Sequence, residues 1–171
     1  MNRFANLASL ATILFSLAAF TATAQQQGFP QHLFFRVTLG PQFSSPASGR
    51  LLLFVSPGRG DKAVDSDMMT PTRTYVAAKE IPYLAPGQTV SVDADDVVFP
   101  GPLSNAPSGD YEVQAVLDVG HTYNYSGRTP GDLQSDVAAL PAWNPQQQVP
   151  PALTLTTTVP EPPDPPPPVT P

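Results

Sequence analysis

Proline and glycine interrupt this chain so often that helices of ordinary length are excluded from most of it. The 171 residues include 23 prolines and 11 glycines. After the apolar segment at the N-terminus, no long stretch has helical spacing of apolar side chains without a proline or a glycine inside it. Proline lacks a backbone donor and clashes with the preceding helical turn, and glycine carries a high entropic cost in a helix. The chain is therefore expected to fold mainly from short strands joined by turns.

Six segments carry the signals of strands. The segment 33–39 places an apolar side chain at every second position, and 51–55 is a continuous apolar run, typical of a strand buried on both faces. In 110–118 the apolar side chains also alternate, with Glu112 and Gln114 facing the other way. This alternation predicts an antiparallel strand with one face in solvent. The predicted strands are 33–39, 51–55, 73–79, 89–93, 110–118 and 152–159, and the segments 58–72 and 120–131 are predicted as long loops.

Short strands separated by turns are typical of an all-β sandwich or barrel. Residues 33–159 are expected to form one domain, an Ig-like antiparallel β-sandwich. A small barrel is the alternative, since the strand pattern is the same in both. The chain contains no cysteine, so no disulfide can stabilise the domain and a packed core must do so.

The first 24 residues have the three regions of an export signal. Arg3 supplies a positive charge, Leu7 to Phe20 is apolar, and Ala22-Thr23-Ala24 offers a cleavage site between small residues. A transmembrane anchor is the alternative, but a spanning helix needs about 20 apolar residues. We therefore expect a cleaved signal peptide over 1–24, a secreted or periplasmic protein, and no membrane span after cleavage.

Two other segments are expected to lie outside the domain, a linker at 25–32 and a proline-rich tail at 160–171. The tail is rich enough in proline to favour an extended, semi-rigid conformation. Removing 1–24 takes away Arg3, which leaves 7 basic residues (8 minus 1) against 14 acidic ones and a formal charge of −7. Such an acidic chain repels phosphate backbones, so nucleic acid is not expected as a partner.

Catalytic and metal-binding signals are weak. The G-x-S-x-G turn of α/β-hydrolases is absent, and the two histidines are His32 and His121. His32 is predicted to be an exposed residue at a strand start rather than a base. The aspartates of 65–67 and 93–96 lack the spacing of a calcium loop, so solvated acidic turns are the preferred interpretation. No metal and no cofactor is expected.

The loop 120–132 is where a binding function is most expected, because binding residues concentrate on loops. Its tyrosines, together with a tryptophan further along the chain, could stack on a sugar ring or anchor a protein partner. The alternative is that these aromatic side chains pack over the edge of the sandwich. The predicted binding residues are His121, Tyr123, Tyr125, Arg128 and Trp143.

A series of turn and strand motifs follows in order along the chain. The motifs are 49–54, 84–88, 99–103, 108–118, 130–136, 153–155 and 159–160. Their order resembles the β-rich N-terminal region of secreted bacterial proteins of the putative esterase (enterochelin-esterase-like) type, over roughly residues 33–160. In those proteins an α/β-hydrolase domain follows the proline-containing junction. This chain has no position for the catalytic residues of that domain, so the resemblance implies an accessory module without esterase activity, either a truncated relative or a stand-alone descendant.

Three functional hypotheses remain. The first is an exported accessory domain that positions a hydrolase domain or binds a cell-envelope component. The second is a carbohydrate-binding module that uses the three aromatic residues of the predicted binding set. The third is a hydrolase of unfamiliar design, which would need His121 with Asp118 or Asp132 and a serine such as Ser126. The first is favoured, because the sequence shows no nucleophile paired with a base and an orienting group.

Overall fold

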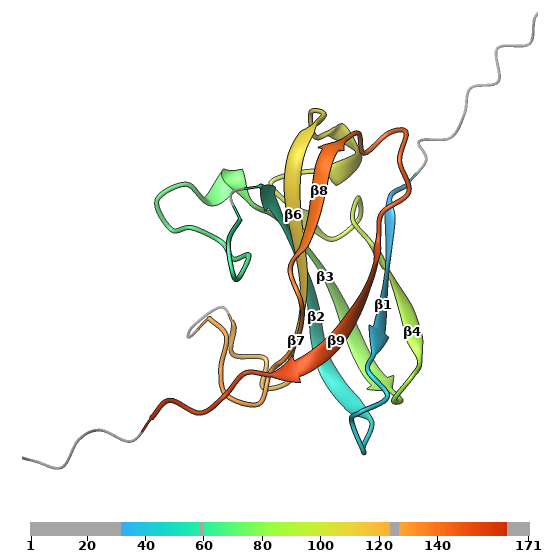
Figure 1. Cartoon of the computed structure of the whole chain (residues 1–171), viewed down its shortest axis with the longest axis vertical. Coiled ribbons are helices and arrows are strands. Elements are labelled where there is room, and N and C mark those ends of the chain that lie inside the picture. The colour runs from blue at the N-terminus through green and yellow to red at the C-terminus, as the bar shows by residue number, and fades with distance from the viewer. Residues whose placement is uncertain (1–31, 59, 124–126, 164–171) are drawn as a thin grey trace, which may run out of the picture.

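The computed structural model describes residues 32–58, 60–123 and 127–163, and the regular secondary structure in them is almost wholly strands, joined by turns and loops (Figure 1). The all-β expectation is confirmed, whereas the predicted signal peptide lies outside the described residues. In this part of the chain no helix is long and apolar enough to cross a membrane. The strands are β1 (Phe34–Leu39), β2 (Ala47–Pro57), β3 (Tyr75–Leu84), β4 (Thr89–Asp93), β5 (Val98–Phe99), β6 (Gly109–Asp118), β7 (Leu133–Ser135), β8 (Ala138–Trp143) and β9 (Ala152–Thr158), and two short 3-10 turns are η1 (Pro71–Arg73) and η2 (Leu103–Asn105).

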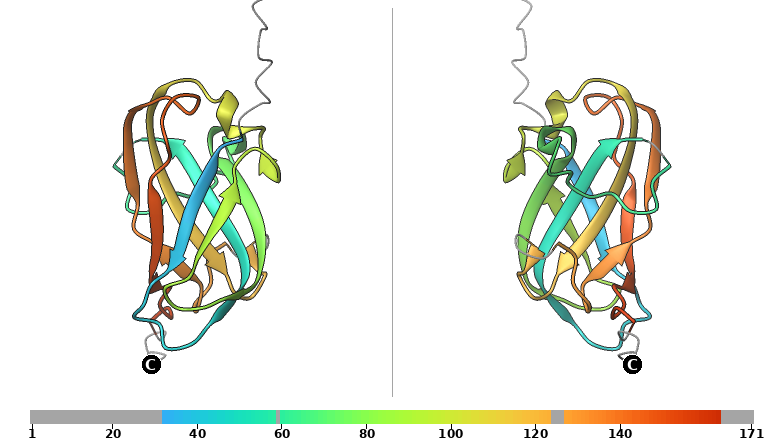
Figure 2. Two further views of the ribbon diagram at one scale, coloured as in Figure 1. Left: turned by 90° about the vertical axis from the view of Figure 1, so that its right-hand side faces the viewer. Right: turned by 90° about the vertical axis from the view of Figure 1, so that its left-hand side faces the viewer.

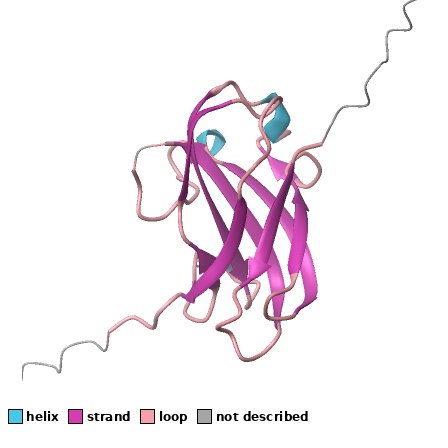
Figure 3. Cartoon of the chain, turned by 45° about the vertical axis from the view of Figure 1, so that its right-hand side comes forward, coloured by secondary structure: helices cyan, strands magenta, loops and turns pink. Residues whose placement is uncertain are grey.

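The strands form one mixed sheet that curls into a half-barrel (Figures 1, 2 and 3). The strand order is β4-β1-β9-β7-β6-β2-β3-β5, and β8 pairs with β6 beside this path. The first and last long strands, β1 and β9, run parallel, and every other pair is antiparallel. The expectation of a purely antiparallel sheet is therefore corrected. Parallel pairing needs a long connection, and here the whole domain separates the two strands.

The half-barrel is held together at the seam between β3 and β4 by a side chain. Lys79 on β3 donates a hydrogen bond of 2.6 Å to the carbonyl oxygen of Ser91 on β4. Strand β5 pairs with β3 only at Val76 and Ala77. Further along β3 lies Pro82, which has no N–H group to donate to a neighbouring strand. Lysine and proline at a strand edge hinder pairing with another chain, so this seam is protected without a closed ladder.

The main core fills the inside of the curled sheet. Alternate residues of β1 point inward, and Phe35, Val37 and Leu39 are fully buried. Strands β2, β6 and β9 contribute apolar side chains in the same way. Trp143, at the end of β8, packs its ring edge-on against Phe35 at 6.1 Å and Tyr111 at 5.8 Å between ring centroids. Alternation in the sequence thus corresponds to burial on the inner face.

All six predicted strand positions carry a strand, but three further strands were not predicted. β5 and β7 are too short to show a pattern, and β8 contains Pro141, which resembles a break. Strands β7 and β8 form because β6 offers them a partner, which local sequence does not reveal. The two-faced burial of 51–55 is confirmed, since these residues are at most 5% exposed.

Adjacent residues of β1 give a direct test of this arrangement. We expect Phe35→Ala to lower the free energy of unfolding by about 3–5 kcal/mol, because it leaves a cavity in the core. The matched control is Phe34→Ala, whose side chain lies on the outer face and is 51% exposed; it should cost less than about 1 kcal/mol. Urea denaturation followed by tryptophan fluorescence measures both. Equal losses would contradict the assignment of the two faces.

Candidate functional site at two loops on the outer face

Two long loops cover the outer face of β2 and β6. The 58–74 loop and the 119–132 loop lie on the same side of the sheet, and the C-terminal segment leaves the domain beneath them (Figure 1). Their presence explains why Glu112 and Gln114 are only 5% and 3% exposed. The prediction that this face of β6 is in solvent is wrong, because the loops replace water as the partner of its polar side chains.

The polar side chains of β6 bind the backbone of the 58–74 loop. The carboxylate of Glu112 accepts hydrogen bonds from the backbone N–H groups of Gly60 and Asp61. The side-chain amide oxygen of Gln114 accepts a hydrogen bond of 3.0 Å from the backbone N–H of Val64. The side chain of Val64 is fully buried. This loop is therefore folded back onto the sheet and fixed at its middle. Neither partner is visible in the sequence pattern, because about 50 residues separate them.

Two buried carboxylates organise the 119–132 loop. Asp118 accepts hydrogen bonds from the backbone N–H groups of Thr122 and Tyr123, at 3.0 and 3.1 Å. Asp132 accepts them from Val119 at 3.0 Å and from Thr129 at 2.7 Å. Both aspartates are 1% exposed. A buried carboxylate is stable only when it is well hydrogen-bonded, and here the loop backbone supplies the donors.

Arg128 ties the two loops together. Its Nη1 donates to the side-chain oxygens of Gln114 and Gln134, at 2.9 and 3.0 Å, and its Nη2 donates to the backbone carbonyl of Val64. The guanidinium also lies over the ring of Phe54, 5.5 Å from the centroid. With 11% of its side chain exposed, Arg128 has a structural function here rather than a free binding one.

Tyr123 makes a second bridge between the loops. Its ring packs on Phe54 with centroids 5.2 Å apart, and its hydroxyl donates a hydrogen bond to the carboxylate of Asp65. Burial, and then the bond to Asp65, raise the pKa of Tyr123 to about 12. The phenol is therefore neutral at physiological pH and serves as a donor. A small apolar cluster of Leu52, Phe54, Val64 and Val116 lies beneath it.

The structure brings together two of the five predicted binding residues, since Tyr123 and Arg128 both pack on the ring of Phe54. His121, Tyr123 and Arg128 lie on the 119–132 loop, whereas Tyr125 is outside the described residues. Trp143 is 3% exposed in the main core and does not join them. Of the three aromatic residues expected to stack on a sugar, the two that the structure describes, Tyr123 and Trp143, lie on opposite faces of the sheet. Tyr123 packs over the sheet, as the alternative interpretation expects, whereas Trp143 lies in the main core.

His121 does not pair with either buried aspartate. Its Nδ1 lies 3.7 Å from an oxygen of Glu80, and the same glutamate accepts a hydrogen bond of 2.7 Å from Arg50. The hydrolase hypothesis required His121 beside Asp118 or Asp132, whose oxygens instead bind backbone N–H groups. The serine proposed for that hypothesis, Ser126, lies outside the described residues.

His32 occupies the exposed position at a strand start that the sequence predicts. Its Nδ1 lies 2.6 Å from the carboxylate of Asp93. This hydrogen bond and the negative charge of Asp93 raise the pKa of His32. A cavity of about 710 Å³ lies beside it, bounded by the turn after β8. Within the described ranges, no three histidine or acidic residues are arranged to hold a metal ion.

An open groove of about 750 Å³ adjoins the 119–132 loop on the outer face of β2 and β3. Three of the residues that line it, Phe34, Val97 and Phe99, are more than half exposed. The paired side chains of Arg50 and Glu80 line it too. The groove is therefore apolar with a charged margin, and sequence reasoning missed it because its residues come from five separated segments.

Comparison with known proteins gives no relative: no family model matches the chain, and neither a curated protein nor a solved structure matches it.

The role of Arg128 can be tested by removing it. We expect Arg128→Ala to lower the free energy of unfolding by about 1–3 kcal/mol, because Val64 and the two glutamines lose a buried charged donor. The 58–74 loop should then be cut faster in limited proteolysis with chymotrypsin, which does not cut at lysine. Lys62→Ala, an exposed change in the same loop, is the control and should change neither quantity. Unchanged proteolysis of Arg128→Ala would refute the bridge.

The raised pKa of Tyr123 predicts a pH dependence. A group whose pKa is higher in the folded protein stabilises it fully below its unfolded pKa and loses that effect as pH rises through the folded value. Stability should therefore fall between pH 10 and about 12, and Tyr123→Phe should reduce the fall. Urea denaturation over this range measures it, with Tyr83→Phe, an exposed residue, as the control. The same slope in all three proteins would exclude Tyr123 as its source.

Proposed function

We propose that this chain is an exported, non-catalytic accessory domain of the kind that precedes the hydrolase in esterase-like bacterial proteins. Its function is to position a hydrolase domain or to bind a component of the cell envelope, through the loops and the groove of its outer face. Export is supported by the N-terminal segment with its charged, apolar and small-residue regions. The curled sheet is consistent with the finer assignment to an Ig-like sandwich, which remains part of this proposal.

The observation that carries the proposal is where the family-like motifs fall in the structure. Gly49 lies so close to β6 that a Cβ would be 2.4 Å from the carbonyl oxygen of Asp118. The motif 84–88 forms the turn between β3 and β4, with Gln88 N–H bonded to the Ala85 carbonyl. The motif 108–118 is β6 itself. The motifs thus fall on strands and turns that build the fold, as the proposed accessory domain requires.

The chemistry-bearing residues of the outer face support a non-catalytic role. Asp118 and Asp132 each accept two hydrogen bonds from loop backbone, and Arg128 joins the loops. The phenol of Tyr123 is held neutral. A catalytic group needs a reactive lone pair or proton directed at a substrate, whereas these side chains direct theirs into the protein. What they produce is a fixed surface.

Genomic sequence beyond the codon for Pro171 provides the first test. We expect a hydrolase reading frame there, in frame or immediately downstream. Unrelated sequence at that place would contradict the association with an esterase. The purified chain provides the second test, since it should hydrolyse p-nitrophenyl esters no faster than buffer does. Turnover above buffer that is lost in His121→Ala would overturn the non-catalytic assignment; the control Lys62→Ala should leave any rate unchanged.

A further inference from the structure

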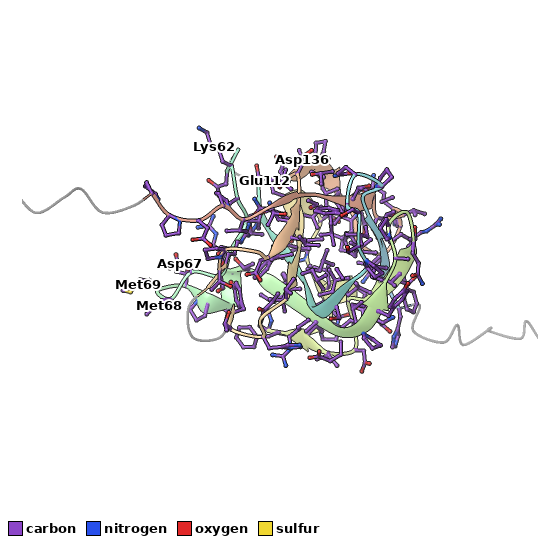
Figure 4. All side chains as sticks on the ribbon, turned by 90° about the horizontal axis from the view of Figure 1, so that it is seen from below. Lys62, Asp67, Met68, Met69, Glu112 and Asp136 are labelled. Atoms are coloured by element: carbon purple, nitrogen blue, oxygen red, sulfur yellow. The ribbon has the colours of Figure 1, made fainter. Side chains whose placement is uncertain are left out.

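The tip of the 58–74 loop presents two adjacent methionines to solvent. Met68 is 95% exposed and Met69 is 87% exposed. Figure 4 shows both side chains projecting from the loop, away from the sheet. Methionine ordinarily fills gaps in apolar cores, so two neighbouring ones without apolar cover are unusual. Apart from Met1, they are the methionines of the chain.

Hydrogen bonds within the loop keep this tip in place. The carboxylate of Asp67 accepts a bond of 2.8 Å from the Met69 N–H and one of 2.9 Å from the hydroxyl of Thr70. The hydroxyl of Thr74 bonds to the carbonyl of Asp65 at 3.0 Å, which closes the base of the tip. Because Val64 and the two bridges to the 119–132 loop fix the other arm, the methionines stay outside the apolar cluster under the loop.

Among the described residues, the other side chains that peroxides oxidise most readily, cysteine and tryptophan, are absent or shielded. The chain has no cysteine, which would otherwise react first with a peroxide. Trp143 is 3% exposed and packed between aromatic rings. The two thioethers are therefore the most accessible sulfur atoms in the described ranges, and oxidation of methionine follows access to the sulfur.

We propose that Met68 and Met69 form an oxidant-reactive modification site, which peroxides convert to methionine sulfoxides in the folded protein. A lone pair of each sulfur attacks one oxygen of hydrogen peroxide, an S–O bond forms and the O–O bond breaks. The sulfur is oxidised by two electrons, and the second oxygen leaves as water after taking up the peroxide's protons. A dithiol reverses the step: the sulfoxide is reduced to the thioether, its oxygen leaves as water and the dithiol becomes a disulfide, which is the reaction that methionine sulfoxide reductases catalyse.

The modification changes the surface chemistry of the loop and leaves the fold intact. A sulfoxide is polar and chiral where the thioether was apolar and flexible. Because neither side chain packs against the core, its oxidation removes no buried contact. An apolar contact made by this tip would be weakened by oxidation and restored by reduction. This inference does not depend on the proposed association with a hydrolase.

The test compares the folded protein with an unstructured peptide of the sequence 64–74. Both are treated with hydrogen peroxide, and peptide mass spectrometry follows the gain of oxygen at each methionine. We expect the two methionines in the protein to react at nearly the same rate as in the peptide. The midpoint of thermal unfolding should be the same before and after oxidation. Methionine sulfoxide reductase with dithiothreitol should remove both oxygens.

Three results would overturn the proposal. One is protection of either methionine in the folded protein, seen as a rate many-fold below that of the peptide. Another is a fall in the unfolding midpoint as the sulfoxides form, which would place the methionines in packed surroundings. The double variant Met68→Leu/Met69→Leu keeps the apolar tip without sulfur and should gain no oxygen there. The third result is oxidation of Trp143 in the wild-type protein before either methionine has gained oxygen, which would reverse the proposed order of reactivity.

Discussion

The side chain of Gln114 is the contact on which the outer half of this structure depends. Its oxygen accepts hydrogen bonds from the Val64 N–H and from Arg128, and its nitrogen donates to the Ser135 carbonyl at 2.7 Å. One amide thus joins the 58–74 loop, the 119–132 loop and strand β7. A buried amide left without partners would cost several times what each bond contributes, so the loops and the strand must be ordered together.

The same constraint explains how a single curled sheet is stabilised without a disulfide. Apolar alternation fills the inside, with Phe35 and Leu39 fully buried. On the outside, Glu112 and Gln114 recruit loop backbone where a second sheet or a helix would otherwise cover the strands. The Lys79 side chain spans the seam between β3 and β4. The domain therefore has a main apolar core inside the sheet, and on its outer face buried polar side chains hold the loops over a smaller apolar cluster.

This division has a functional consequence. The side chains that sequence reasoning selected for binding are, in large part, those that fix the loops, as Arg128 and Tyr123 illustrate. The groups left to meet a partner are instead exposed apolar ones, Phe34 and Phe99 in the groove and the methionine pair at the loop tip. A rigid surface with such contacts suits an accessory domain, in which position matters more than reactivity.

The sequence by itself determined the exclusion of long helices, the six main strands and the burial of 51–55, because proline, glycine and alternation act within a few residues. It also determined that no cysteine could contribute. The tertiary structure alone decided that β1 and β9 pair in parallel, that β8 forms around Pro141, that Trp143 turns inward and that the polar face of β6 is covered. The physical reason is that these features depend on contacts between residues far apart in the sequence. The partner of Gln114 on the first loop is 50 residues away, and a polar side chain in a strand looks the same in sequence whether water or a returning loop satisfies its hydrogen bonds.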